Sequence, residues 1–218
     1  LPDYNVYIKK GCEFLELPAP KDLDEALDGL LILYSHVPSI TTFPVYIGRL
    51  DMLLDPFITD EEQDYIKIKR FLNHVDKTVP DSFCHANIGP YDTKAGRLIL
   101  KAVIELEAPT PNMTIRYDKS KTSREFAELA AKACLLVSKP SFANDAYYIS
   151  DLGEQYGIAS CYNALPECGG AYTLTRLRLG TIARACKTVD EMVNELLPRV
   201  AKCALSTMDK RHKFVVEE

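Results

Sequence analysis

Strand-like and helix-like segments alternate along this chain, and this alternation limits the possible folds more than any other feature. Short strands are predicted at residues 43–48, 82–87 and 113–117, where apolar, aromatic and β-branched residues cluster. Helical patterns separate them, with only short connections between. Strands joined through helices in this way build βαβ units. We therefore predict an α/β fold in which parallel β/α units form one mainly parallel sheet covered by helices.

The helices are predicted where apolar residues recur every three or four positions, at 22–37, 61–77, 92–107, 122–137 and from 188 onward. Thr122 with Glu125, and Thr188 with Glu191, have the spacing of a capping box. Pro198 lies inside the last helix and should kink it. The remaining predictions are a turn at 53–57, an extended segment at 146–149 and a strand at 171–179.

Composition excludes several classes of function. The formal net charge is −5, with 26 basic against 31 acidic residues, so we expect neither nucleic acid nor an anionic membrane surface as a partner. Apolar runs such as Leu30–Leu33 are far too short to span a bilayer. Seven irregularly spaced cysteines favour a reducing cytoplasm. Without a break in composition, residues 1–218 are predicted to form a single domain.

A cysteine-bearing loop follows the predicted strands. Small residues lead from Gly157 to Cys161, and Pro166 and the Gly169-Gly170 pair follow, so that the backbone can bend tightly there. This pattern predicts Cys161 at a loop tip. Buried cysteines are also common small core residues, so that most of the seven are expected to be structural.

Polar residues are predicted at the carboxyl ends of the strands, which is where parallel β/α folds place their working residues. They are His85, Asn87, Arg116, Tyr117, Asn144 and Asp145. Each also has a structural interpretation. Arg116 can pair with a carboxylate, His85 can be a core histidine, and Asn144-Asp145 can cap a turn.

Three segments in order resemble the central part of the glycyl radical enzymes, the family of pyruvate formate-lyase. They are the strand Pro111–Tyr117, the run Pro140–Asp145 after a helix, and the loop Gly157–Cys161. The sequences of residues 81–92 and 151–170 are most similar to the YjjI-type branch, whose reaction is unassigned. The resemblance covers about residues 40–218.

The resemblance implies a β/α barrel around a finger loop, with a cysteine at the loop tip that becomes a thiyl radical and abstracts hydrogen from a small organic substrate. Cys161 matches that cysteine. This chemistry requires a dry, closed cavity, because water or a second thiol would quench the radical. On this reading, the candidate substrate contacts are His85, Asn87, Arg116, Asn144, Asp145 and Glu167.

Three differences from the family qualify this reading. Ser160 stands before Cys161, where pyruvate formate-lyase has a second cysteine. Asn163 stands where the dehydratases carry a general-base glutamate in Cys-x-Glu. Glu167 could supply a carboxylate and Cys168 a second sulfur, although a solvated glutamate and an inert thiol fit equally well.

The third difference is that none of the ten glycines is followed by tyrosine, so the Arg-Val-x-Gly-Tyr site that stores the radical is missing. The chain also begins with leucine and ends in a charged run. We therefore expect a segment of a longer protein, whose C-terminal glycyl radical domain lies elsewhere and without which this chain is inactive.

Two other hypotheses remain open. The chain can be a non-catalytic or split α/β scaffold that needs a radical-bearing partner. It can also be a hydrolytic cysteine/histidine enzyme, which would require a base such as His85 close to Cys161. Walker, dinucleotide-binding and His-Glu-x-x-His motifs are lacking, so we predict no bound nucleotide, metal or other cofactor. The radical reading implies a radical S-adenosylmethionine activating enzyme as partner, a homodimer when full length, and anaerobic metabolism in the cytoplasm.

Overall fold

The computed structural model describes residues 3–40, 45–78, 84–107, 111–159, 163–167 and 175–217. The chain divides into two compact units, Leu1–Gly169 and Gly170–Glu218. Whether the two units act as one domain, as the sequence suggests, stays a prediction. In the described residues, no helix combines the length and the apolar character that crossing a membrane requires.

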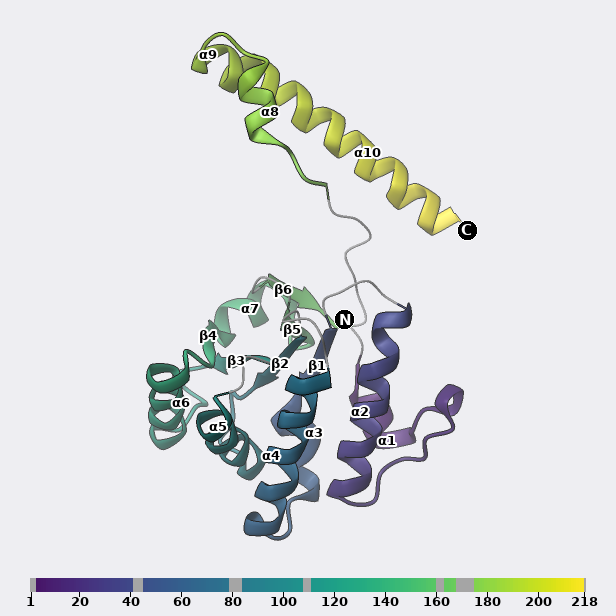
Figure 1. The fold of residues 1–218 in the computed structure, drawn as a ribbon, viewed down its shortest axis with the longest axis vertical. Helices are drawn as coiled ribbons and strands as arrows, with labels where there is room; N and C mark the ends of the chain where they lie inside the picture. The colour runs from purple at the N-terminus through teal and green to yellow at the C-terminus, as the bar shows by residue number, and fades with distance from the viewer. Residues whose placement is uncertain are drawn as a thin grey trace. The chain divides into compact units, whose positions relative to one another are not determined.

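Four parallel strands form the centre of the first unit (Figure 1). They lie side by side in sequence order as β1 (Val45–Arg49), β2 (Cys84–Ile88), β3 (Asn112–Tyr117) and β4 (Ser141–Asn144). The register pairs Asn87 with Thr114, and Thr114 with Ser141. The prediction of a parallel α/β sheet is therefore confirmed. The described strands form an open sheet and no closed barrel, so the barrel stays a prediction.

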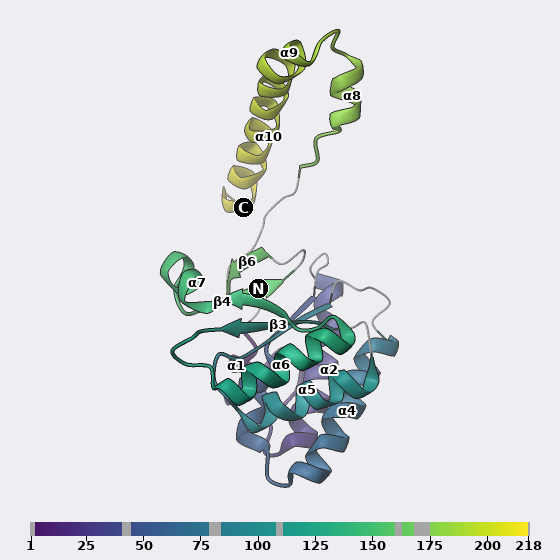
Figure 2. The same ribbon diagram turned by 90° about the vertical axis from the view of Figure 1, so that its left-hand side faces the viewer.

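Helices cover one side of this sheet (Figures 1 and 2). The longer ones are α2 (Leu23–Ile40), α4 (Glu61–Thr78), α5 (Lys94–Leu106) and α6 (Arg124–Val137). The shorter helical segments are α1 (Asn5–Lys10), η1 (Glu13–Leu15), α3 (Leu50–Leu54) and η2 (Asp55–Phe57). The region predicted as a turn at 53–57 is thus helical. Buried apolar residues of these helices and of β1–β3 form one continuous core.

The N-terminal cap of α6 differs from the prediction. Ser123 is the capping residue, and its Oγ accepts a hydrogen bond from the Phe126 amide at 3.1 Å. Thr122 instead accepts one from the Asp118 amide. The cap lies one residue later because Thr122 closes the turn that leaves β3. In α5, Thr93 caps the helix by accepting from the Gly96 amide.

The sheet has one apolar face and one polar face. Residues of β2 and β3 that face the helices, such as Ala86 and Ile115, belong to the apolar core. Because successive side chains of a strand alternate between faces, the opposite face receives His85, Asn87, Thr114 and Arg116, all buried. A sheet face made of buried polar side chains needs a second layer that supplies hydrogen bonds.

A hairpin and a helix supply that second layer (Figure 2). The hairpin pairs β5 (Tyr156–Ala159) with antiparallel β6 (Asn163–Pro166), and α7 (Asp145–Leu152) precedes it. The prediction of an extended segment at 146–149 was wrong, because these residues lie within α7. Their tyrosines and isoleucine favour strands, but Asn144 caps a helix there and Asp145 is buried against the sheet.

The second unit is helical in its described part. It contains α8 (Leu179–Arg184), α9 (Val189–Glu191), the π-helical turn η3 (Met192–Leu196) and α10 (Leu197–Glu217). Thr188 caps α9 by accepting from the Glu191 amide, as predicted. The strand predicted at 171–179 is absent from its described part, 175–179. Pro198 has no N–H for an i−4 bond, and the wider η3 turn directly before it accommodates this loss.

Candidate functional site

Asn87 fixes the hairpin to the polar face of the sheet. Its Nδ2 donates to the Ile158 carbonyl at 2.9 Å, and its Oδ1 accepts from the Ile158 amide at 2.7 Å. The side-chain amide thus replaces a neighbouring strand for this residue of β5. The oxygen and the nitrogen of the Asn87 side-chain amide both form hydrogen bonds to the hairpin, and the residue is fully buried. Its first role here is therefore to position the hairpin.

Arg116 and Asp145 form a buried ion pair beside the hairpin. Arg116 Nε donates to Asp145 Oδ1 at 2.7 Å, and its two terminal nitrogens donate to the backbone carbonyls of Tyr156 and Glu154. The guanidinium carbon also lies 3.9 Å from the centre of the Tyr156 ring. Arg116 is only 2% exposed and Asp145 is fully buried. The pair therefore ties β3 to α7 and to β5.

The environment of Asp145 favours its ionised form. Burial by itself raises the pKa of the carboxyl, but hydrogen bonds from Arg116 and from the Tyr156 hydroxyl (2.8 Å) outweigh it, so the pKa falls below its usual value. Lys121 Nζ approaches the second carboxylate oxygen at 3.4 Å. Two cations thus surround this carboxylate. A buried charge that is paired and hydrogen-bonded in this way is stable in the folded protein.

Tyr46 and Glu167 meet at the other end of the hairpin. The Tyr46 hydroxyl lies 3.4 Å from both Asn87 Oδ1 and Glu167 Oε1. Its ring packs against Gly157, where a Cβ atom would clash with the ring. Burial first, and then the neighbouring Asp3 carboxylate, raise the pKa of Glu167. Glu167 is therefore held at the sheet, and at a given pH a larger fraction of it is protonated than of a solvated glutamate.

His85 and Asn144 have different surroundings. His85 is buried on the polar face, next to Tyr46 and Asn112 in the register of the sheet. Burial lowers the pKa of His85 to about 4, so the ring is neutral near pH 7. Asn144 is exposed, and its Oδ1 accepts from the Tyr147 amide as the cap of α7. Its capping role, which the sequence left open, is thus observed.

The predicted site residues therefore fall into three groups. Asn87, Arg116, Asp145 and Glu167 surround the hairpin, His85 lies on the same sheet face, and Asn144 caps α7 away from them. Cys161 and Cys168 lie outside the described residues. The register, which pairs Ala159 with Asn163, shows that residues 160–162 connect the two strands of the hairpin. No group of three or more potential metal ligands occurs in the described parts of the chain.

Sequence reasoning missed a second group of buried polar residues, at the ends of β1 and β2. Asp51 is fully buried and accepts a hydrogen bond from the Gly89 amide at 2.7 Å, and burial raises its pKa to about 6. Arg49 donates to the Gly89 carbonyl at 3.3 Å. The positive φ of Gly48 (77°) allows the irregular register that brings Arg49 beside Asn87.

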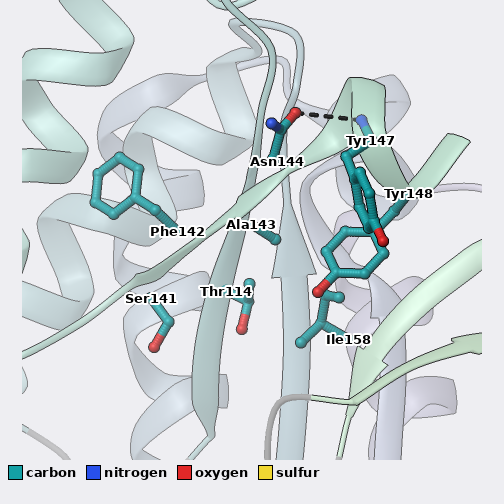
Figure 3. A pocket seen from close by; sticks show the side chains of 8 residues that line it. All are labelled: Thr114, Ser141, Phe142, Ala143, Asn144, Tyr147, Tyr148 and Ile158. Carbon is teal, nitrogen blue, oxygen red and sulfur yellow. Dashed lines mark hydrogen bonds between the residues drawn. The ribbon is translucent and has the colours of Figure 1, made fainter. Parts of the chain in front are cut away.

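A cavity of about 240 Å³ lies between β3, β4, β5 and α7 (Figure 3). Its polar lining includes Thr114, Ser141 and Tyr148, and Ile158 of the hairpin contributes apolar surface. Strand alternation was the signal that could have found Thr114, because it stands two residues before Arg116 and so shares its face. The hairpin that contains residues 160–162 thus also forms a wall of this cavity.

Comparison with known proteins identifies the family. The sequence model of the family described as "Glycyl radical enzyme YjjI-like" matches residues 1–218. An "Uncharacterized protein" of Haemophilus influenzae is 93% identical over 218 residues, which are all of this chain and 42% of that protein. "Uncharacterized protein YjjI" of Escherichia coli is 43% identical over 221 residues, covering all of this chain and 43% of that protein.

The chain thus spans less than half the length of these relatives. The family match covers the strands, the hairpin and the segment that contains Cys161. The predicted resemblance to the YjjI-type branch is therefore confirmed, and this chain belongs to the YjjI-like glycyl radical enzyme family.

Proposed function

We propose that this chain is the part of a glycyl radical enzyme that holds the hydrogen-abstracting cysteine, Cys161. The observation that carries the proposal is the fixed position of the β5–β6 hairpin, whose connection contains Cys161. Asn87, Arg116 and Tyr46 hold this hairpin against the polar face of a parallel sheet. Radical chemistry needs a sulfur placed precisely beside the substrate, and the anchored strand β5, which leads to Cys161 in sequence, supports this proposal.

The proposed reaction begins with two successive hydrogen-atom transfers. The Cys161 S–H bond breaks homolytically and its hydrogen atom passes to the glycyl radical of the full-length protein, which leaves a thiyl radical. The thiyl then takes a hydrogen atom from a substrate C–H bond, so that the thiol is restored and the unpaired electron moves to the substrate carbon. Atoms and electrons balance at both steps, and no charged intermediate is required.

The neutral state of His85 favours the radical hypothesis over the hypothesis of a hydrolytic cysteine/histidine enzyme. A hydrolytic cysteine needs a nearby base that accepts its proton near neutral pH. Burial lowers the pKa of His85 to about 4, which makes it a poor base for this purpose. The proposal keeps the other expectations that go with the family: a small-molecule substrate, an activating enzyme of the radical S-adenosylmethionine class, and a homodimer of full-length chains in the cytoplasm.

Deuterium exchange into the glycyl radical tests the proposal without knowledge of the substrate. The full-length protein is activated without oxygen, transferred to D₂O, and followed by electron paramagnetic resonance. A thiol exchanges its proton with D₂O, so a cysteine that returns hydrogen to the glycine will place deuterium on its α-carbon. We expect the doublet splitting caused by the α-hydrogen to collapse in the wild type and to persist in Cys161→Ala.

Cys203→Ala is the matched control, because Cys203 is an exposed thiol on α10 and should leave the exchange unchanged. Persistence of the doublet in the wild type would favour the scaffold hypothesis, in which Cys161 exchanges no hydrogen with the radical. Equal collapse in wild type and Cys161→Ala would assign the exchange to another thiol and overturn the proposal.

A further inference from the structure

The hydroxyl of Thr114 is an exceptional polar group in the cavity between β3, β4, β5 and α7. Thr114 is 1% exposed, and its Oγ1 has no hydrogen-bond partner among the described residues. Buried hydroxyls are nearly always paired, because an unpaired one loses its hydrogen bonds to water without replacement. Since Thr114 lines the cavity, a ligand there can supply the missing bond.

Ser141 and Tyr148 contribute two further hydroxyls to the lining of the same cavity. Ser141 is the register partner of Thr114 in β4, and Tyr148 comes from α7. Figure 3 shows the Tyr148 hydroxyl beside Ile158, and Thr114 between Ser141 and Ile158. A hydroxyl both donates and accepts a hydrogen bond. Such a set therefore fits ligand hydroxyl or carbonyl groups, which also donate or accept.

Among the described residues that line the cavity, tyrosine is the only type with an ionisable side chain. The charged side chains beside the hairpin are paired with one another: Arg116 and Lys121 both contact Asp145, at 2.7 and 3.4 Å, and Lys121 also contacts Asp118 at 3.2 Å. A charged ligand would therefore give up part of its hydration without meeting an unpaired counter-charge, which is costly. His85, on the same sheet face, adds no charge because burial keeps its ring neutral near pH 7.

The aromatic residues do not form a cage for a cation. Recognition of an ammonium group by aromatic rings requires ring faces turned toward one point. Figure 3 shows Phe142 on the opposite side of β4 from Ser141, pointing away from the tyrosines. Tyr147 and Tyr148 instead contact each other in a T-shaped arrangement, with ring centres 5.3 Å apart.

We propose that this cavity binds an uncharged, hydroxyl-bearing small molecule, and that this is the substrate class of the enzyme. The assignment to the substrate rests on the proposed role of Cys161, since the hairpin that contains Cys161 also places Ile158 in the cavity wall. The cavity of about 240 Å³ is below the range of drug-sized sites, which is about 300 to 1,000 Å³, so the ligand has only a few carbon atoms. Thr114 and Ser141 bind its oxygen atoms.

Binding to the full-length protein before activation tests the ligand class independently of the radical. Three probes of similar size differ at one terminal group and hence in charge: erythritol carries a neutral CH₂OH there, erythronate a carboxylate, and 1-amino-1-deoxyerythritol an ammonium group. Their dissociation constants can be measured by saturation-transfer NMR titration. We expect erythritol to bind at least tenfold more tightly than either charged probe.

Thr114→Val removes the hydroxyl at nearly constant volume and should weaken erythritol binding about fivefold, in line with the loss of one hydrogen bond. The control is Thr78→Val, the same change at an exposed residue at the end of α4, which should leave binding unchanged. Thermal unfolding of both variants separates loss of the ligand contact from loss of folding.

Tighter binding of either charged probe, binding of none of the three, or an unchanged erythritol affinity in Thr114→Val would overturn the proposed ligand class. If the class holds but Cys161 exchanges no deuterium with the glycyl radical, the cavity stands as a ligand site and its assignment to the radical reaction is overturned. If exchange occurs but the probes fail, the radical role stands alone.

Discussion

Arg116 has the most demanding environment of any residue near the hairpin, and this leads to a prediction about stability. Removing its side chain leaves Asp145 fully buried without its strongest partner. Breaking a buried pair from one side costs about 3 to 5 kcal/mol. Arg116→Ala should therefore lower the free energy of unfolding by about that amount, as measured by denaturant unfolding.

The control is Arg124→Ala, which removes an exposed i,i+4 pair with Glu128 and should leave the free energy of unfolding nearly unchanged. The contribution of Asp145 also depends on pH. Its pKa in the folded protein is below the unfolded value of about 3.9, so its stabilisation is complete above that value and is lost as the pH falls through the lower folded pKa. The difference in the free energy of unfolding between wild type and Arg116→Ala should therefore become smaller in acid. Equal losses for both arginine variants would contradict this account.

Individual residues also show where sequence reasoning succeeds and where it stops. The polar residues at the strand ends were identifiable because alternation and strand direction place them at one edge. The partners of these residues could not be identified from the sequence. Arg116 and Asp145 are 29 residues apart in the chain, and Asn87 and Ile158 are 71 residues apart. Asp51 was missed because nothing local distinguishes a buried aspartate from a helix-start aspartate.

The hairpin is the element on which the candidate site depends, and at Gly157 it packs directly against the Tyr46 ring of β1. Any side chain at Gly157 would clash with the ring of Tyr46. Gly157→Ala should therefore push the hairpin away from β1. We expect the backbone amides of Tyr156–Ala159 to lose at least tenfold in protection against hydrogen exchange, measured by mass spectrometry.

A second substitution makes that prediction specific. Tyr46→Leu in the Gly157→Ala background removes the clashing atoms and should restore part of the protection. Gly180→Ala is the matched control, because its new Cβ would meet only Arg184, at 3.8 Å. If Gly157→Ala left the hairpin amides as protected as in the wild type, the contact with Tyr46 would not be what sets the hairpin position.

Among the elements, the long helices and the central strands were predictable because their hydrophobic periods are clear. The failure at α7 has a physical reason. Residues 146–149 have the composition of a strand, and the helix depends on the Asn144 cap and on the burial of Asp145 against Arg116. Tertiary contacts therefore decided between two local structures of similar intrinsic preference. The cysteine loop was predicted from its small residues, and the hairpin that flanks it is observed, whereas residues 160–162 lie outside the described part.

For the molecule as a whole, the sheet leaves one edge of β4 without a neighbouring strand in the described residues. Near it, Phe142 of β4 is 48% exposed, and Leu135 and Leu136 at the end of α6 are 88% and 60% exposed. Unpaired strand edges and exposed apolar groups are normally covered in native proteins. The relatives are more than twice the length of this chain, so they contain enough sequence for further β/α units.

We predict that in the full-length protein a further strand pairs with the outer edge of β4, as the proposed barrel requires. Hydrogen exchange of Ser141–Asn144 should then be at least tenfold slower in the full-length protein than in the isolated 218-residue chain. The central strands β2 and β3 serve as internal controls, because they are already paired on both sides and should exchange equally slowly in both samples. Equally fast exchange of β4 in both proteins, with β2 and β3 protected, would mean that the sheet ends at β4 and that the barrel does not form in this way.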